Sequence, residues 1–218
     1  LCVIAEELGR FLAPVPFSSS VYLFTEAIIN YGTEEIKKDI LPKLVNGEIV
    51  GTLAVTEDLH APTKDNINLS YSNGKVNGKK IAVPDAGVAT HAVVVAKSDK
   101  GISLQLVDLS ATGVSIEHQE NIDESRGHFA ISFNDTETKL LGDEVSGWEL
   151  YESLINQAAV LFSYEQIGGS QATLDMAINY AKERYAFGRP IGSYQAIKHK
   201  LADMYIALTL AKSNCYYA

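Results

Sequence analysis

Three residues that interrupt helices, Gly188, Pro190 and Gly192, separate two stretches of helical periodicity near the end of the 218-residue chain. Apolar residues follow a helical spacing on both sides: Leu174, Ala177, Ile178 and Ala181 before the interruption, and Ile197, Leu201, Met204, Leu208 and Ala211 after it. Because neither glycine nor proline readily continues a helix, the sequence predicts two helices that turn back on each other. Arg184 and Phe187 then lie at the corner, where a cation and a ring suit a flat, anionic partner.

The hydrophobic period divides the chain into three parts. Helical spacing runs through residues 1–48, short β-type segments fill residues 49–144, and helical spacing returns over residues 145–218. We therefore expect an α+β fold with the end of an N-terminal helical domain, a middle antiparallel β barrel or sandwich, and the start of a C-terminal helical bundle. The chain begins and ends within helical patterns, so we expect this fold to be incomplete at both ends.

Local signals add detail to this outline. The Asn-Gly pair at 73–74 predicts a β-hairpin turn, and the pair at 77–78 repeats that signal. Strict alternation over residues 102–106 predicts a half-buried strand. A long helix is predicted over residues 148–183, and the glycines at 168–169 inside it each cost about 1 kcal/mol relative to alanine. Such a cost predicts that another helix approaches closely there.

Composition excludes several classes of function. The net charge of −9 argues against nucleic acid or an anionic membrane surface as the main partner. No apolar run approaches the roughly 20 residues of a membrane-spanning helix, and the five histidines show no spacing typical of a metal site. Cys2 and Cys215 form no C-x-x-C motif, which favours a reducing compartment: the cytoplasm of a bacterium or the mitochondrial matrix of a eukaryote.

The corner sequence carries a family resemblance. The matching residues are Arg184, Phe187, Gly188, Ile191, Tyr194, Gln195, Ala196 and Ile197. Their spacing resembles the Arg-x-x-Phe-Gly-x-x-Ile-x-x-aromatic-Gln-Ala-Ile run of the acyl-CoA dehydrogenase family. The resemblance implies that Arg184, Phe187 and Gln195 reach across a subunit interface to the diphosphate and flavin of a neighbour's FAD. A guanidinium can bind phosphate oxygens through two hydrogen bonds, and an amide both donates and accepts. The alternative interpretation is a helical hairpin in which Arg184 only caps a helix end.

Two other segments resemble the family in part. Val55 and Thr56 match the strand that contacts the isoalloxazine ring in the family, but the Pro-Gly-x-Gly-Ser sequence that follows there is missing after Glu57. Residues 77–80 match well, whereas the family's Trp-Ile-Thr is replaced by residues 82–84, Ala-Val-Pro. The resemblance therefore implies a flavin site that lacks a stacking ring, and a proline without hydroxyl or N–H where the family has threonine.

The resemblance also implies a reaction and a catalytic base. A carboxylate removes a proton next to the thioester carbonyl, while the neighbouring carbon passes a hydride to the flavin. In the family this base is a Glu at one of two places. One aligns with Ala158, and the other lies beyond Ala218, so the catalytic residue is unknown. Ala159 stands where the family usually has Arg. Glu152 and Glu165 are the nearest acids, and a solvated helix face explains each of them more simply.

Two interpretations remain open. In the first, the chain belongs to an FAD-dependent dehydrogenase of a divergent branch, a homo-oligomer with an acyl-CoA substrate and an electron-transfer flavoprotein-like acceptor. In the second, it is a flavin-poor, catalytically degraded partner subunit in a heteromeric dimer or tetramer. Residues 13–16 and 83–85 resemble branches that act on bulky or polycyclic acyl-CoAs, including the steroid-type branch, where mixed tetramers occur. A third option is another chemistry on the same fold, an oxidase or a flavin monooxygenase.

Overall fold

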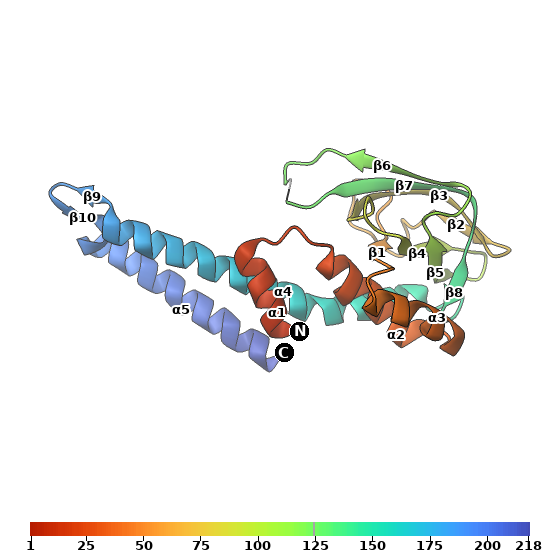
Figure 1. Cartoon of the computed structure of the whole chain (residues 1–218), viewed down its shortest axis with the longest axis horizontal. Helices are drawn as coiled ribbons and strands as arrows, with labels where there is room; N and C mark the ends of the chain where they lie inside the picture. Colours follow the sequence, from red (N-terminus) through yellow and green to blue (C-terminus); the bar gives the residue numbers. More distant parts are fainter. Residues whose placement is uncertain (124) are drawn as a thin grey trace. The chain divides into compact units, whose positions relative to one another are not determined.

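The computed structural model describes residues 1–123 and 125–218. Helices come first, strands follow and helices return, as the sequence predicted (Figure 1). The elements are α1 Cys2–Phe11, the π-helix η1 Ser18–Thr25, α2 Glu26–Tyr31, α3 Glu34–Val45, β1 Gly51–Ala54, β2 Ser70–Ser72, β3 Lys75–Pro84, β4 His91–Lys97, β5 Ile102–Asp108, β6 Val114–Gln119, β7 His128–Glu137, β8 Lys139–Leu141, α4 Gly147–Glu183, β9 Tyr185–Ala186, β10 Arg189–Pro190, the 3₁₀ turn η2 Ile191–Ser193 and α5 Gln195–Tyr217. The fold is α+β.

The chain forms two compact units, each described separately below. One unit comprises Pro14–Ala158, and the other joins Leu1–Ala13 to Ala159–Ala218. The predicted domain boundaries at residues 48 and 144 stay a prediction.

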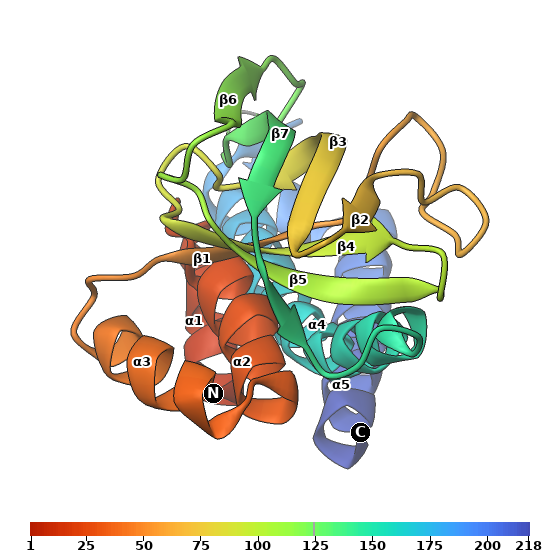
Figure 2. The same cartoon turned by 90° about the vertical axis from the view of Figure 1, so that its right-hand side faces the viewer.

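A mixed sheet dominates the Pro14–Ala158 unit (Figure 2). Within the described residues its strands follow the order β6-β7-β3-β2-β4-β5-β8, with β1 added beside β4. The pairs β1–β4 and β2–β4 are parallel, and the other pairs are antiparallel. The expectation of a mostly antiparallel sheet is thus confirmed, with two parallel pairings that the sequence did not indicate.

The centre of this sheet is more deeply buried than the sequence predicted. Residues 92–96 of β4 are fully buried, in keeping with their continuous apolar run. The prediction of a half-buried β5 is wrong, because its polar residues Ser103 and Gln105 are also fully buried. The Gln105 amide donates to Ser103 Oγ at 2.8 Å and accepts from Thr138 Oγ1 at 2.9 Å. These polar groups satisfy one another, and Gly147 at the start of α4 packs directly on Ser103.

The two Asn-Gly pairs behave differently. Asn73 and Gly74 form the turn between β2 and β3 with φ angles of 51° and 76°, which confirms the first prediction. The prediction of a second turn is wrong, because Asn77 and Gly78 lie inside β3 at a register shift. There the Asn77 side chain accepts from the backbone N–H of Asp135 at 2.8 Å and donates to its carboxylate at 3.1 Å. A side chain held by the neighbouring strand keeps this pair extended.

In the other unit, α1 packs closely on α4. A Cβ added at Gly168 would lie 1.8 Å from the carbonyl oxygen of Glu6, and one at Gly9 would lie 1.9 Å from that of Glu165. These glycines therefore permit backbone contact, which confirms the predicted close approach at Gly168. A salt bridge of 2.5 Å from Lys212 to Glu6 joins α5 to α1.

The described residues lack two features, a membrane-spanning helix and a cluster of metal-binding side chains. No helix among them is long and apolar enough to cross a bilayer. No group of three or more His, Cys, Asp or Glu side chains within the same residues could hold a metal ion.

Candidate cofactor-binding site

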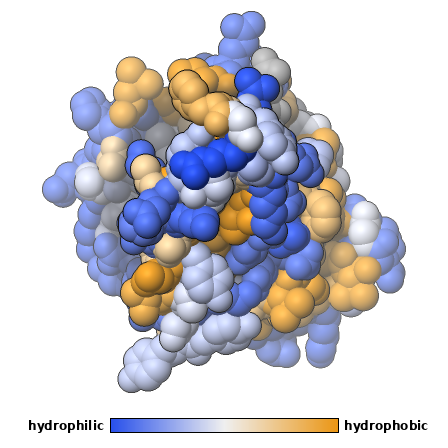
Figure 3. All heavy atoms as spheres, turned by 90° about the vertical axis from the view of Figure 1, so that its left-hand side faces the viewer, coloured by the Kyte–Doolittle hydropathy of each residue, from blue (hydrophilic) through white to orange (hydrophobic). Residues whose placement is uncertain are grey.

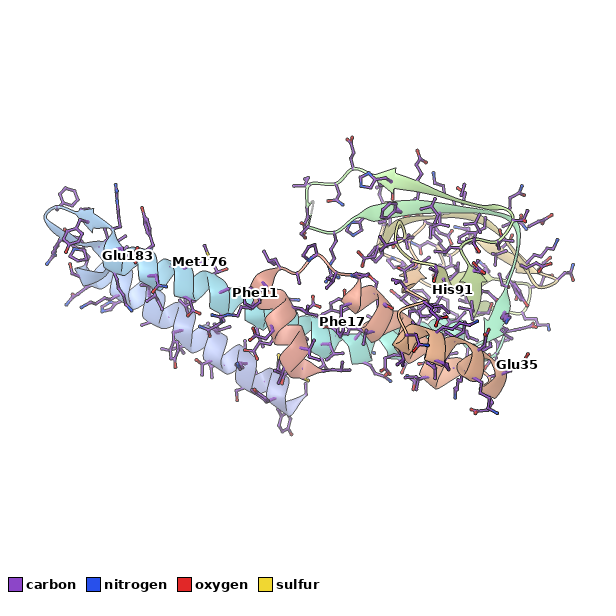
Figure 4. The ribbon with its side chains drawn as sticks, viewed as in Figure 1. Phe11, Phe17, Glu35, His91, Met176 and Glu183 are labelled. Atoms are coloured by element: carbon purple, nitrogen blue, oxygen red, sulfur yellow. The ribbon has the colours of Figure 1, made fainter. Side chains whose placement is uncertain are left out.

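A short β-hairpin connects α4 to α5, and we refer to residues 184–195 as the corner. After α4 ends at Glu183, which is labelled in Figure 4, β9 and β10 pair antiparallel across Phe187 and Gly188. The φ angles of these two residues are 53° and 77°, both in the left-handed region. The turn-back predicted from Gly188, Pro190 and Gly192 is confirmed, and the two-residue hairpin is a detail that the sequence analysis missed.

Contacts within the corner hold it in one conformation. The N–H of Ile191 donates to the carbonyl oxygen of Arg184 at 2.8 Å, and the Tyr194 hydroxyl donates to that of Ala186 at 2.9 Å. The Arg189 guanidinium stacks 4.0 Å from the centroid of the Tyr194 ring. These contacts brace the corner, which means that they fix its backbone conformation.

The three side chains predicted to contact a ligand are exposed on the corner. Phe187 is 96% exposed, and Arg184 and Gln195 are exposed as well. Figure 3 views the molecule from the end that carries the corner and shows hydrophilic and hydrophobic side chains intermixed on that surface. Within residues 1–123 and 125–218, no side-chain hydrogen bond or salt bridge engages Arg184. Its guanidinium does not cap the carbonyls of α4 there, which argues against the purely structural interpretation.

Phe187 also carries backbone strain. A non-glycine residue with positive φ costs about 1–2 kcal/mol, and a bulky aromatic residue is rare in this region. Its almost fully exposed ring recovers little of that cost by packing within this unit. Strain that local packing does not offset is typical of functional sites.

The second predicted contact region lies where β1 runs past β3, and we name residues 55–57 and 80–85 the β1–β3 junction. Val55 is 8% exposed, and its carbonyl oxygen accepts from Lys80 Nζ at 2.9 Å. The carbonyl oxygen of Thr56 accepts from the N–H of Ile81 at 2.8 Å. Both residues lie just beyond β1, which ends at Ala54. Their predicted contacts with flavin stay a prediction.

The β3 side of the junction contains an irregularity at the substituted positions. Ala82 adopts φ 51° at a register shift, and its N–H donates to Gln119 Oε1 at 2.8 Å. Pro84 has no N–H, and its carbonyl oxygen accepts from Thr52 Oγ1 at 2.7 Å. Val83 between them is buried. Residues 82–84 thus offer neither an aromatic ring nor a hydroxyl group, and they fit a flavin less well than the corner fits a diphosphate.

A buried ion pair supports the junction, and the sequence analysis missed it. Lys80 is fully buried, and its ammonium group lies 2.7 Å from Glu57 Oε1. Burial lowers the pKa of Lys80 to about 8, although the hydrogen bond and the charge of Glu57 act in the opposite direction. The only sequence signal was a lysine at a position of β3 that alternation assigns to the interior.

A polar cluster beside the junction was also missed. Ser19 donates to the carboxylate of Asp85, and Arg126 donates to Ser18 Oγ. Ser18 and Ser19 belong to η1, where the sequence analysis expected an ordinary helix, and both are buried. The run of three serines at 18–20 was the available signal.

The helix positions predicted to carry a catalytic pair lack charged groups. Ala158 is 1% exposed, and Ala159 is exposed with its carbonyl oxygen accepting from Ser163 Oγ at 2.8 Å. Glu152 is exposed, as expected for a solvated helix face. Glu165 lies where α4 packs against Gly9 of α1. None of these observations identifies a base.

Comparisons with known proteins identify the family. Residues 1–48 match the model for the N-terminal domain of acyl-CoA dehydrogenases, and residues 145–218 match the model for their C-terminal domain. The two matches together cover more than half of the chain. The chain belongs to the acyl-CoA dehydrogenase family. This confirms the resemblance first seen at the corner.

Individual acyl-CoA dehydrogenases extend this result. The mitochondrial isovaleryl-CoA dehydrogenase of Oryza sativa subsp. japonica is 31% identical over 99% of the chain, which spans 56% of that relative. The structure of an acyl-CoA dehydrogenase from Geobacillus kaustophilus has a TM-score of 0.90 at 26% identity, covering 98% of this chain and 61% of its own. A variant of the Tcur3481-Tcur3483 steroid ACAD has a TM-score of 0.85 at 29% identity, with coverages of 99% and 58%.

The cofactor predicted from the sequence, FAD, is present in solved structures of the same fold. The FAD complex of PigA has a TM-score of 0.86 at 23% identity over 99% of this chain and 61% of its own, a likeness of fold alone. Membership in the acyl-CoA dehydrogenase family supports FAD as the cofactor.

Proposed function

We infer that this chain is part of an FAD-dependent acyl-CoA dehydrogenase, which removes hydrogen from two adjacent carbons of a CoA thioester. The observation that carries this inference is the braced corner, with Arg184, Phe187 and Gln195 exposed on it. FAD supplies the acceptor for the hydride that leaves the substrate. The proposed substrate is an acyl-CoA, and the proposed electron acceptor is an electron-transfer flavoprotein-like protein.

Each corner side chain suits one part of a dinucleotide. The Arg184 guanidinium can donate two parallel hydrogen bonds to diphosphate oxygens. The Gln195 carboxamide can both donate and accept, and the Phe187 ring provides a flat apolar surface. Because all three face outward, we assign them to FAD held by a second subunit, so the proposed enzyme is a dimer or a tetramer.

The reaction requires a base that removes a proton from the substrate, and no described residue is assigned to that role. A carboxylate in a dry site would remove the proton next to the thioester carbonyl. Ala158 occupies one of the two positions where the family carries that carboxylate. We therefore leave the base unassigned within this chain.

The second candidate function is that of a partner subunit whose own flavin site is degraded. The observation that favours it is the sequence Ala82-Val83-Pro84 on β3, where the ring and the hydroxyl group expected at a flavin are missing. In this version the corner still binds FAD, but that FAD belongs to a different polypeptide. The match to a steroid ACAD is compatible with this version.

A flavin spectrum tests both candidates. The chain is purified alone and after co-expression with a paralogue, and the visible absorbance of bound flavin is compared with protein concentration. Stoichiometric flavin in the chain alone supports the self-sufficient enzyme, and flavin only in the co-expressed complex supports the partner subunit. An acyl-CoA added without oxygen should bleach the flavin of either complex. Absence of flavin from both preparations would overturn the proposed function.

A further inference from the structure

Lys80 is a charged side chain in a position that sheet packing assigns to the interior. Its side chain is fully buried, yet its ammonium group has two partners, the carbonyl oxygen of Val55 at 2.9 Å and Glu57 Oε1 at 2.7 Å. The neighbouring Lys79 pairs instead with Glu117 at 3.9 Å on the surface, where both side chains are more than half exposed. Adjacent lysines on one strand therefore have opposite environments.

The Glu57 carboxylate extends this contact to a third segment. Its Oε2 accepts from the N–H of Asn68 at 2.8 Å, and its Oε1 accepts from the N–H of Leu69 at 3.0 Å. Leu69 is 2% exposed and lies directly before β2. One buried ion pair therefore joins the residues after β1, the interior of β3 and the entry to β2.

The Lys80 side chain provides a backbone contact just beyond the end of β1. The residues paired between β1 and β4 end at Ala54, and no backbone N–H of the described residues donates to the carbonyl oxygen of Val55. Lys80 provides that hydrogen bond from its side chain, and the N–H of Ile81 fixes Thr56 at 2.8 Å. Two consecutive residues of β3 thus set two consecutive carbonyl groups beyond the end of β1.

The desolvation cost of the Lys80–Glu57 pair indicates that the pair does more than stabilise the fold. Burying an ion pair is often no more stabilising than apolar residues of the same volume, because desolvation offsets the attraction between the charges. The lowered pKa of Lys80, about 8, shows that burial disfavours its charge even beside Glu57. In some proteins, buried ionic groups fix one particular arrangement of their neighbours, and here the neighbours are Val55 and Thr56.

We propose that Lys80 is a positioning residue for the flavin ring, because together with Glu57 it fixes the backbone of Val55 and Thr56 in the conformation that contacts the cofactor. This inference rests on the proposed FAD-dependent function. Lys80 acts through the backbone of those two residues and does not itself touch the reacting atoms.

The test separates positioning from simple charge compensation. Lys80→Met combined with Glu57→Gln removes both charges, so no unpaired ion remains buried and the double variant should regain most of the stability that either single change loses. The variant is purified in the complex that retains flavin in the wild type. Its FAD dissociation constant should rise by about 10-fold, equivalent to about 1.4 kcal/mol, because the backbone of Val55 and Thr56 is no longer held in the conformation that contacts the flavin. The visible circular dichroism of the bound flavin should change at the same time.

Lys79→Met is the matched control, because it removes one positive charge from the adjacent residue of the same strand. It should leave both the dissociation constant and the flavin spectrum unchanged. A double variant with the affinity and spectrum of the wild type would overturn the positioning role.

Amide hydrogen exchange distinguishes failure of this inference from failure of the proposed function. The N–H groups of Ile81 and Leu69 report on Thr56 and Glu57 without any flavin. In the double variant both should exchange at least about 10-fold faster than in the control, as expected when local hydrogen bonding is lost. A wild type that binds no flavin would reject the enzyme, and unchanged exchange in the double variant would independently reject the positioning role.

Discussion

The corner and the β1–β3 junction both contain a non-glycine residue with positive φ, but the two residues differ in how their surroundings support them. At the junction, Ala82 with φ 51° has its N–H bonded to Gln119, and its neighbour Val83 is buried. At the corner, Phe187 with φ 53° exposes 96% of its surface. The first irregularity is supported by its own unit, whereas the second leaves an aromatic ring exposed. The comparison indicates that contacts within its own unit hold the junction in place, whereas the corner leaves its strained residue free to contact a partner.

The same contrast holds for the charged groups. Lys80 is fully buried and bonds to Glu57 and to the carbonyl oxygen of Val55. Arg184, by contrast, is exposed, and its side chain is unpaired within the described part of the chain. Removing a buried charge should therefore alter stability most, and removing an exposed one should alter binding most.

Lys80→Met should have the largest effect, a decrease of about 3–5 kcal/mol in the free energy of unfolding. The substitution leaves Glu57, which is 12% exposed, without its cation and leaves the carbonyl oxygen of Val55 without its donor. Urea denaturation measures the change. Lys79→Met should stay within about 0.5 kcal/mol of the wild type. A similar loss in both variants would show that the Lys80 environment is not special.

A rise in pH should stabilise the junction. The pKa of Lys80 is about 8 in the folded protein, below the ordinary lysine pKa of 10.5, so the unfolded chain binds more protons between these values. Stability therefore rises with pH in that window, by up to about 3 kcal/mol from this residue, and the penalty for burying the charge is fully present below pH 8. Urea denaturation at several pH values, with Lys80→Met as reference, isolates the contribution. Equal slopes in the two proteins from pH 8 to 10.5 would contradict it.

Arg184→Ala should act on binding and leave stability almost unchanged. Loss of a charge-assisted contact to the diphosphate should raise the FAD dissociation constant of the oligomer by about 10- to 100-fold. Because Arg184 is exposed and has no side-chain partner within the described residues, the unfolding free energy should change by less than about 0.5 kcal/mol. Fluorescence titration with FAD gives the constant. Lys200→Ala, an equal loss of charge at an exposed residue of α5, should bind FAD like the wild type. Unchanged affinity in Arg184→Ala would remove this residue from the site.

The sequence predicted the helical and β-rich parts because their hydrophobic periods differ and because residues such as Gly188 and Pro190 mark the turn between the last helices. It did not predict the burial of Ser103 and Gln105, since alternation assigns polar side chains to solvent. Those two side chains are hydrogen-bonded to each other, and the backbone of Ser103 packs against Gly147 at the start of α4, which only the folded chain reveals.

The site was predictable to the same limited extent. The helix-breaking residues and the family resemblance placed Arg184, Phe187 and Gln195 on one corner. No spacing rule, however, joins Glu57, beyond the end of β1, to Lys80 inside β3. The exposure and backbone conformation of Phe187 likewise depend on the two-residue hairpin, whose strands are too short for a period to detect. Sequence patterns therefore predicted which exposed side chains share the corner better than they predicted the buried contacts.

Phe187→Gly should change stability only slightly, and it should raise stability while it weakens FAD binding. Glycine adopts positive φ without steric cost, which favours the folded chain by about 1–2 kcal/mol, while its greater entropy in the unfolded chain returns about 0.5–1 kcal/mol. The free energy of unfolding should thus rise by about 0.5–1 kcal/mol, because the exposed ring contributes little packing within its unit. FAD affinity should fall in the same variant, since the ring is lost. A destabilised variant would show that the ring packs within its own unit, and unchanged affinity would show that strain at the corner serves no ligand.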